Sequence, residues 1–173
     1  PTDHTRVDPR LGTWADVKAL TARTAVMADL LVNHVSRRAA QFQDYDRHGD
    51  ASRYAGMFLT FGQVFPDGAS ESALQALYTI RATLPFTTHD TAAGASAVLW
   101  TTFTSDQIDL DVTHPETQRY FSAVLARFQE AGITMLRLDA VGHAVKKAGT
   151  SCFMIPETFA FIERLTAEAR GRG

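Results

Sequence analysis

The sequence has little of three features, each of which would indicate a particular class of protein. Cys152 is its single cysteine, which excludes an internal disulfide and leaves no neighbouring cysteines for a zinc cluster. Its 17 basic and 19 acidic residues give a formal net charge of -2, which argues against nucleic acid as a partner. No apolar run approaches the roughly 20 residues that a membrane-spanning helix needs, so we expect no membrane partner.

The residues that are present are typical of a folded domain. Hydrophobic residues make up 45% and charged residues 21% of the 173 residues, enough for one domain with a core and too few for two of ordinary size. The sequence shows no signal peptide, but it begins at Pro1 without a methionine, which leaves open that an N-terminal segment is missing. With one cysteine and no signal peptide, we expect a cytoplasmic protein.

Three segments have the spacing of amphipathic helices. The first is predicted over about 13–24, with Thr13 as its N-cap. The second is predicted over about 115–131, with Thr113 and Glu116 spaced as a capping box. The third begins at about residue 156. The side chains that this last helix is expected to bury are Phe159, Ile162 and Leu165.

Two mostly apolar segments, 25–33 and 133–139, are predicted as buried strands of a parallel sheet. Each follows a predicted helix by a short connection, which favours right-handed β-α units. About 80 residues separate Asn33 from Pro115, far more than the roughly 2–6 residues of an ordinary connection. We interpret this stretch as a small inserted subdomain.

The number of strands bears on the fold class. A β/α barrel takes about 250 residues and eight strands, so two strands indicate a slice of a larger α/β protein. A compact two-stranded α/β domain is the alternative, and it would leave apolar strand edges exposed.

Polar residues lie towards the end of each predicted strand. Residues two apart on a strand point to the same side, so Arg137 and Asp139 are expected to stand together. A carboxylate that an arginine keeps ionised can act as a nucleophile, although an ordinary ion pair is the simpler alternative. Asp29, in the other strand, needs a partner for its charge, and Arg137 is the natural candidate. His34 leaves that strand at the same end, as a site residue or as a structural histidine.

These two strand ends together resemble the α-amylase family of glycosidases and transglycosidases. They read Asp-x-x-x-Asn-His and, about a hundred residues later, Arg-x-Asp-Ala. That family inserts a subdomain between its third and fourth barrel strands, where this chain has its long stretch. Longer runs are similar to the sucrose phosphorylases within the family, and these runs are 1–14, 41–44, 57–60, 84–87, 137–142 and 149–154.

The resemblance implies part of a (β/α)8 TIM barrel, covering about strands 3 and 4. It divides the chain into a barrel segment over 1–35, an inserted subdomain (domain B) over 36–104 and a second barrel segment over 105–173. The family's acid/base glutamate and its transition-state-stabilising aspartate lie on later strands, and Glu157 and Glu163 cannot replace them. We therefore expect the isolated chain to be inactive and its parent to be active.

The resemblance also implies an activity. Such enzymes transfer a glucosyl group from sucrose to inorganic phosphate with net retention, through a covalent glucosyl-aspartate. By position, Asp139 matches the nucleophile, Arg137 the arginine that holds it, and His34 the histidine that binds glucosyl hydroxyls. Phe103 matches an aromatic that packs against the sugar, with a core aromatic as the alternative. No cofactor and no metal ion is implied, and a homodimer is one expected assembly of the parent.

The acceptor side departs from the family pattern. Tyr78 and Arg81 match a tyrosine and an arginine on a loop near the phosphate, which suits an arginine fork. The usual run is Tyr-Arg-Pro-Arg-Pro, and residues 79–82 lack the first arginine and both prolines. His143 stands where sucrose phosphorylases commonly carry tyrosine, either at the leaving-group side or as a helix-start histidine.

These departures leave alternatives open. Within the superfamily, the parent is a phosphorylase for another acceptor (glucosylglycerate, glucosylglycerol or a sucrose phosphate), or an amylosucrase-like or α-glucosidase-like enzyme. In a different class, the chain is an inactive sugar-binding or structural remnant.

Overall fold

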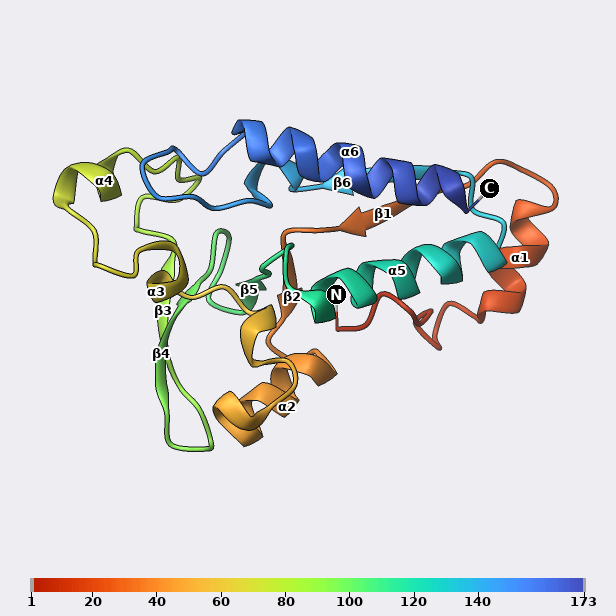
Figure 1. Cartoon of the computed structure of the whole chain (residues 1–173). Helices are drawn as coiled ribbons and strands as arrows, with labels where there is room; N and C mark the ends of the chain where they lie inside the picture. Colours follow the sequence, from red (N-terminus) through yellow and green to blue (C-terminus); the bar gives the residue numbers. More distant parts are fainter. Residues whose placement is uncertain (1, 173) are drawn as a thin grey trace.

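The computed structural model describes residues 2–172, which fold into an α/β architecture (Figure 1). Its central feature is a pair of parallel strands, β1 (Met27–Leu31) and β6 (Met135–Asp139), whose register sets Asp29 opposite Arg137. The pairing confirms the two predicted strands; β1 is two residues shorter than expected at each end, and β6 begins two residues later than expected and ends at Asp139 as expected. Since the described residues hold only these two parallel strands, their assignment to barrel strands 3 and 4 stays a prediction.

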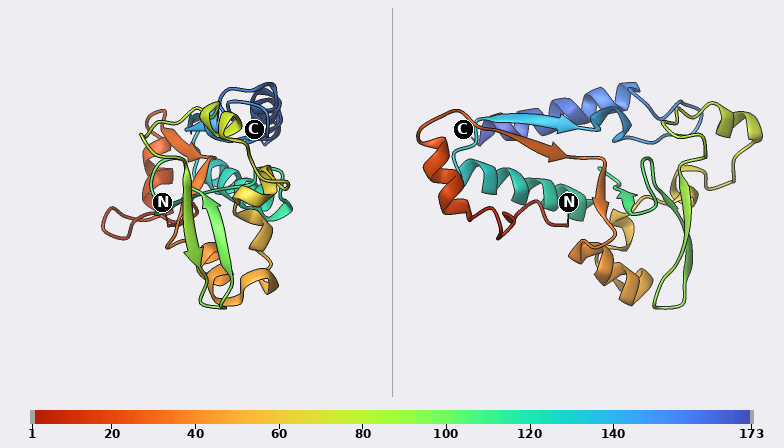
Figure 2. Two further views of the ribbon diagram at one scale, coloured as in Figure 1. Left: turned by 90° about the vertical axis from the view of Figure 1, so that its left-hand side faces the viewer. Right: turned by 180° about the vertical axis from the view of Figure 1, so that it is seen from behind.

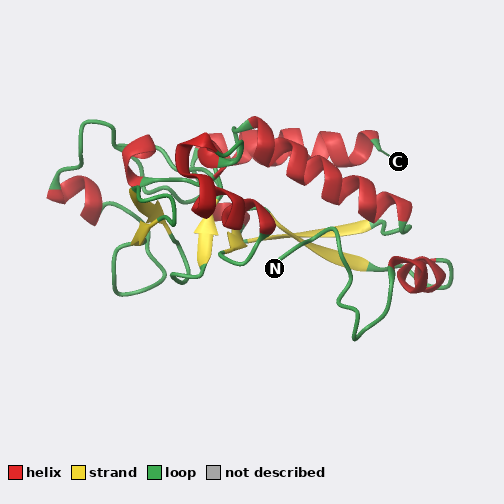
Figure 3. Ribbon diagram, turned by 90° about the horizontal axis from the view of Figure 1, so that it is seen from below, coloured by secondary structure: helices red, strands yellow, loops and turns green. Residues whose placement is uncertain are grey.

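Three helices accompany the sheet. α1 (Trp14–Thr21) precedes β1, α5 (Pro115–Glu130) precedes β6, and α6 (Pro156–Gly171) follows it. The two long helices, α5 and α6, lie on one side of the paired strands (Figures 2 and 3). Apolar side chains from both helices enter the core with strand residue Leu30, whereas Met27 on the opposite sheet face is 57% exposed. The sheet is therefore covered on one face and open on the other.

Local sequence explains how α1 and α5 begin, with one correction. Thr13 caps α1 and forms a capping box with Asp16, as its position predicts. The capping box predicted between Thr113 and Glu116 is wrong, because His114 is the N-cap of α5 and accepts a hydrogen bond from the Glu116 backbone N–H. Thr113 is one residue too early, and both its N–H and its hydroxyl donate to Asp111.

The buried face of α6 also differs from the prediction. Phe159 is 53% exposed, whereas Phe161 and Leu165 are buried. Thr158 is fully buried and belongs to the same helix face as these two residues. The prediction counted apolar side chains alone, so it missed a stripe that includes a buried threonine.

The chain between β1 and α5, residues 32–114, forms short elements that are not part of the parallel sheet, and we call this segment the insert. β2 (His34–Ser36) follows β1 almost directly and pairs antiparallel with β5 (Gln107–Asp109), which sets His34 opposite Asp109. β3 (Phe86–Asp90) and β4 (Ser96–Trp100) form a second antiparallel pair. The other elements of this segment are helices α2 (Ala40–His48), α3 (Phe61–Val64) and α4 (Glu71–Gln75) and the 3-10 turns η1 (Gly49–Ala51) and η2 (Ala55–Met57). A third 3-10 turn, η3 (Val141–His143), follows β6.

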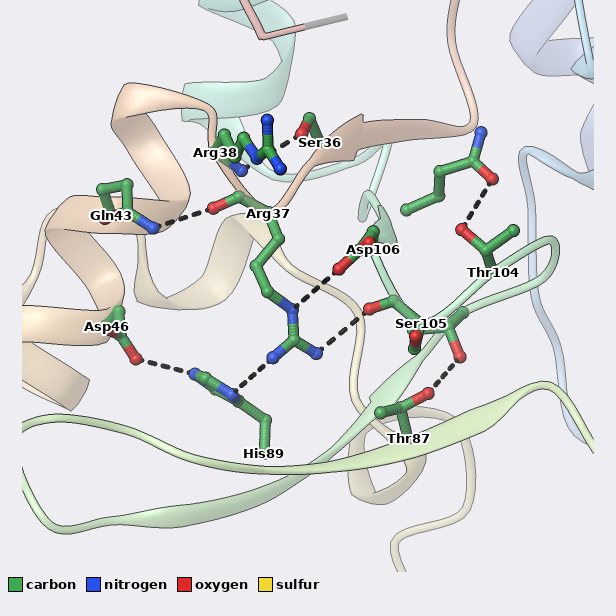
Figure 4. A network of polar contacts seen from close by, with 12 residues as sticks. Ser36, Arg37, Arg38, Gln43, Asp46, Thr87, His89, Thr104, Ser105 and Asp106 are labelled. Carbon is green, nitrogen blue, oxygen red and sulfur yellow. Dashed lines mark hydrogen bonds and ion pairs between the residues drawn. The ribbon is translucent and has the colours of Figure 1, made fainter.

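Polar contacts fasten the inserted elements to one another (Figure 4). Arg37, just after β2, donates to the Ser105 carbonyl at 3.0 Å, and its NH1 lies 3.1 Å from Nδ1 of His89 on β3. Nε2 of His89 lies 2.7 Å from the Asp46 carboxylate on α2. One arginine therefore joins the β2 end to β3 and to the loop before β5. The limits of a separate subdomain at 36 and 104 stay predictions.

Two apolar clusters hold the molecule together. The larger runs from the covered sheet face into the insert and includes Phe42, Phe58 and Ile108, all fully buried. The smaller lies within the insert around Trp100, and Cys152 from the loop after η3 is buried in it. The loop after β6 is thus packed onto the insert. Among residues 2–172, no helix has both the length and the hydropathy of a membrane span.

Candidate active site

Three charged side chains share the open face of the β1–β6 sheet. NH2 of Arg137 lies 2.8 Å from Oδ1 of Asp139, and NH1 lies 3.0 Å from Oδ2 of Asp29. The hydrogen bond to Asp29 and the charges of both carboxylates raise the pKa of Arg137, so the guanidinium stays charged. The expectations that Arg137 stands beside Asp139 and is the partner of Asp29 are confirmed.

The backbone turns sharply directly after Asp139. Ala140 has a φ of 56°, in the left-handed region, and leads into η3. The other two described non-glycine residues with positive φ, Cys152 and Met154, lie in the loop that folds back over η3. Such conformations are costly for side chains with a Cβ and gather at functional sites. Here they bring Phe153 and Met154 to the rim beside Asp139.

A surface hollow of about 380 Å³ adjoins the carboxylate, and Asp139, Phe103 and His143 are among its lining residues. Phe103 is only partly buried, so the alternative that it is a core aromatic does not fit its position. Its ring centroid lies 5.1 Å from that of His34 and 5.6 Å from that of His143. Four of the predicted site residues thus meet in one place.

Tyr78 packs behind one aromatic residue that lines the hollow, Phe153. Tyr78, which is 50% exposed, stacks on Phe153 with ring centroids 4.3 Å apart, and Phe153 lies 4.7 Å from His143. Phe153 lies within the run 149–154 that resembles the sucrose phosphorylases, but it was not predicted as a site residue. Its signal was an aromatic in a loop that directly follows the strand bearing Asp139.

Arg81 lies apart from this group. Its NH2 donates to the Leu84 carbonyl at 2.9 Å and to the Thr101 hydroxyl at 3.1 Å, both within the insert. Its Nε is buried and finds no partner among the described residues. The structure therefore packs Tyr78 against two residues that line the hollow, His143 and Phe153, while a phosphate-side role for Arg81 stays a prediction.

A buried ion pair lies behind the two histidines, and sequence analysis missed it. Nζ of Lys146 lies 2.7 Å from the Asp109 carboxylate, with the two side chains 1% and 0% exposed. Asp109 also accepts from the Thr102 N–H at 3.1 Å and from its hydroxyl at 2.5 Å. The available signals were an aspartate in the apolar run 108–112 and a lysine three residues after His143.

Burial and nearby charge set the protonation of the two histidines. Burial is the largest cause and lowers the pKa of His34; among the charged side chains, Asp109 and then Asp139 raise it, and Lys146, the weakest of the three, lowers it. Burial likewise lowers the pKa of His143, followed by the charge of Lys146. Both imidazoles are therefore neutral near pH 7. Within residues 2–172 there is no cluster of three or more His, Cys, Asp or Glu side chains that could hold a metal ion.

A family model described as alpha amylase, catalytic domain, matches residues 1–167. The chain belongs to the α-amylase family. Within that family it is 52% identical over all 173 residues to a sucrose phosphorylase of Agrobacterium vitis and 44% identical to one of Bifidobacterium adolescentis. It covers 36% and 34% of those relatives, so it spans about a third of their length.

Structural comparison agrees with this assignment to the α-amylase family. The crystal structure of sucrose 6F-phosphate phosphorylase from Thermoanaerobacter thermosaccharolyticum superposes with a TM-score of 0.94 at 36% identity, covering 100% of this chain and 36% of that one. The α/β fold is thereby confirmed, as is the resemblance to sucrose phosphorylases.

Proposed function

We propose that this chain carries the nucleophile side of a retaining glucosyl phosphorylase that acts on sucrose. The observation that carries the proposal is the position of Asp139: held by Arg137, it borders a hollow walled by aromatic rings. The 52% identity to a sucrose phosphorylase supports sucrose as the donor.

In the proposed reaction, a carboxylate oxygen of Asp139 attacks the anomeric carbon of the glucosyl unit. The bond from that carbon to the fructosyl oxygen breaks, and the fructosyl oxygen takes a proton from an acid elsewhere in the protein. A phosphate hydroxyl oxygen then attacks the same carbon, its proton returns to that acid/base group, and the bond from the carbon to Asp139 breaks. Two inversions give glucose 1-phosphate with net retention.

The remaining side chains bind and orient the sugar. The partly buried ring of Phe103 offers an apolar face to the C–H groups of glucose, and His34 beside it offers an imidazole to the hydroxyls. Tyr78, His143 and Arg81 form the leaving-group and acceptor side. The acid/base glutamate belongs to a later strand of the parent, so the isolated chain is inactive.

The proposed frame for this site is a partial TIM barrel. Residues 1–35 and 105–173 supply barrel strands 3 and 4 with their helices, and 36–104 form domain B between them. The antiparallel pairing of β2 with β5 supports an insert that leaves and returns at one end of the sheet.

The test uses a protein of the relatives' length that carries this chain. We expect it to release glucose 1-phosphate from sucrose only when phosphate is present, and Asp139→Asn to abolish the release. Asp106→Asn is the matched control, since that carboxylate is 82% exposed and should leave the rate unchanged. Sucrose consumption without phosphate would point instead to a hydrolase or an amylosucrase-like enzyme.

A second candidate differs only in the acceptor. Residues 79–82 lack an arginine and two prolines of the family run, and the superposed relative is a sucrose 6F-phosphate phosphorylase. The parent would then act on a sucrose phosphate, glucosylglycerate or glucosylglycerol. The test runs the reaction in reverse and compares the rates at which different acceptors take the glucosyl group from glucose 1-phosphate. A clear preference for fructose would exclude this candidate.

A further inference from the structure

The buried Lys146 ammonium contacts three oxygens from three separate parts of the chain. It donates to Oδ1 of Asn33 at 2.8 Å, at the end of β1, and pairs with Asp109 on β5 at 2.7 Å. It also donates to the backbone carbonyl of His143 in η3. One cation therefore joins the segments that follow the carboxyl ends of β1 and β6 to β5, directly behind the candidate site.

Its contact with Asn33 fixes the orientation of an amide. Because Oδ1 of Asn33 accepts from Lys146, its amide nitrogen must be the end that faces Nδ1 of His34, at 3.4 Å. An amide nitrogen only donates, so Nδ1 of His34 must be an acceptor without a proton. An imidazolium donates from both nitrogens and does not fit this environment.

The other ring nitrogen of His34 then carries the proton. As placed, the Gln107 side-chain nitrogen lies 2.9 Å from Nε2 of His34, and the Thr104 hydroxyl donates to the Gln107 side-chain oxygen at 3.0 Å. Two amide donors would then face both ring nitrogens of His34, so the Gln107 amide has to be turned over. A glutamine amide has nearly the same shape when its oxygen and nitrogen are exchanged, and a hydroxyl serves either end. With the Gln107 oxygen towards His34, every hydrogen bond of the ring is satisfied.

Charged groups approach the two histidines from every element packed around them. Asp109 on β5, Asp139 on β6 and Lys146 face His34, and Lys146 and Asp109 face His143. The ammonium and the Asp109 carboxylate oppose each other at both rings. Loss of the ammonium alone would leave the carboxylate uncompensated and would favour protonated imidazole.

We propose that Lys146 is a positioning residue of the candidate site. Its buried ammonium orients Asn33, neutralises Asp109 and holds the turn of His143, and so keeps both histidines neutral, with the proton of His34 on Nε2. The consequence for sugar binding rests on the proposed function. The tautomer of His34 and the pKa values of His34 and His143 do not rest on the proposed function. They can be measured even if the phosphorolysis test fails.

The first test needs no variant. Nitrogen-15 NMR of the imidazoles in the intact chain at pH 7 should show His34 with its proton on Nε2 and a bare Nδ1. A proton on Nδ1, or a charged ring, would overturn the proposal, because either state contradicts the amide orientation that Lys146 imposes. This result stands whether or not a Lys146 variant folds.

The second test compares two adjacent lysines. In Lys146→Met the Asn33 amide is free to turn and Asp109 has lost its counterion, so the pKa of His143, for which Lys146 is the largest cause after burial, should rise by about one unit. The pKa of His34, on which Lys146 acts more weakly, should rise by less. Lys147→Met removes the same charge one residue away, where the side chain is 57% exposed and paired with Glu157. A folded Lys146→Met chain with histidines that titrate as in Lys147→Met would overturn the proposal.

Discussion

Two ion-pair clusters meet at the candidate site, and they differ most in their exposure to solvent. We call Arg137, Asp29 and Asp139 the open cluster, and Lys146 and Asp109 the sealed cluster. Arg137 and its partners Asp29 and Asp139 are 55%, 52% and 32% exposed, whereas Lys146 and Asp109 are almost completely buried. Both clusters join β1 or its end to a segment at or after β6. In water a charge pair contributes little to stability, whereas a buried charge without its partner is strongly unfavourable.

This difference indicates separate tasks. A carboxylate that has to meet a substrate must remain accessible, and Asp139 keeps one side to the hollow while Arg137 holds it. A cation that only has to orient other groups is best kept from solvent, where water cannot compete for its hydrogen bonds. The open cluster therefore suits chemistry, and the sealed cluster suits positioning.

The largest expected effect breaks the sealed cluster. Lys146→Met should lower the free energy of unfolding by about 3–5 kcal/mol, because it leaves the Asp109 carboxylate buried and unpaired. Urea denaturation at pH 7 measures it, with the exposed neighbour Lys147→Met as control. The double variant Lys146→Met/Asp109→Leu should recover most of the loss, and no recovery would mean that the charge of Asp109 is not the cause.

Low pH should lower the free energy of unfolding through a second buried group, His4. His4 is mostly buried beside Tyr120, whose hydroxyl lies 2.9 Å from its Nδ1, and burial lowers the pKa of His4 from 6.5 to about 4. Between about pH 6.5 and pH 4, His4 is therefore protonated in the unfolded chain but not in the folded chain. Stability should be full above pH 6.5 and should fall on the order of 2–3 kcal/mol as the pH drops to 4.

The measurement is urea denaturation at several pH values between 7 and 4, for the unmodified chain and for His4→Gln. The variant removes the titrating group, so its stability should fall less steeply over the same range. If the free energy of unfolding falls equally steeply with decreasing pH in both chains, the pKa of His4 is not lowered by burial as the structure indicates.

An intermediate effect on stability is expected at Gly142, which lies between Asp139 and Lys146 in the sequence. A Cβ at Gly142 would lie 2.6 Å from the ring of Phe153 and 3.1 Å from the sulfur of Met154. Gly142→Ala should therefore displace Phe153 from Tyr78 and lower the free energy of unfolding by about 1–3 kcal/mol. Gly62→Ala is the control, because its Cβ meets nothing within 4 Å, and the denaturation midpoints of the two variants should move in opposite directions.

The open cluster could be predicted from sequence, because it depends on a short periodicity. Arg137 and Asp139 alternate on one strand, and parallel pairing with the other apolar run brings Asp29 opposite Arg137. The sealed cluster could not, because Asp109 and Lys146 lie on either side of α5 and meet only through the pairing of β2 with β5. No local pattern in the chain specifies that pairing.

Where local prediction failed, a neighbouring polar group had changed the outcome. Thr113 has the side chain of an N-cap, but Asp111 takes its hydroxyl and its N–H, and the helix begins one residue later. The phosphate-side role of Arg81 stays a prediction, but its contacts could not be read from the sequence either, because the Thr101 hydroxyl and the Leu84 carbonyl accept from its guanidinium. Residue type sets what a side chain can bind, and the tertiary structure decides which partner it meets.

The smallest expected change in stability tests the open cluster most directly. Arg137→Gln removes two ion pairs, yet all three side chains are in contact with water, so the free energy of unfolding should change by less than about 1 kcal/mol. If the proposed function holds, the same variant in a protein of the relatives' length should lose most of the phosphate-dependent release of glucose 1-phosphate, because Asp139 is no longer held. A large loss of stability with activity intact would reverse the roles assigned to the two clusters, since it would make the open one structural.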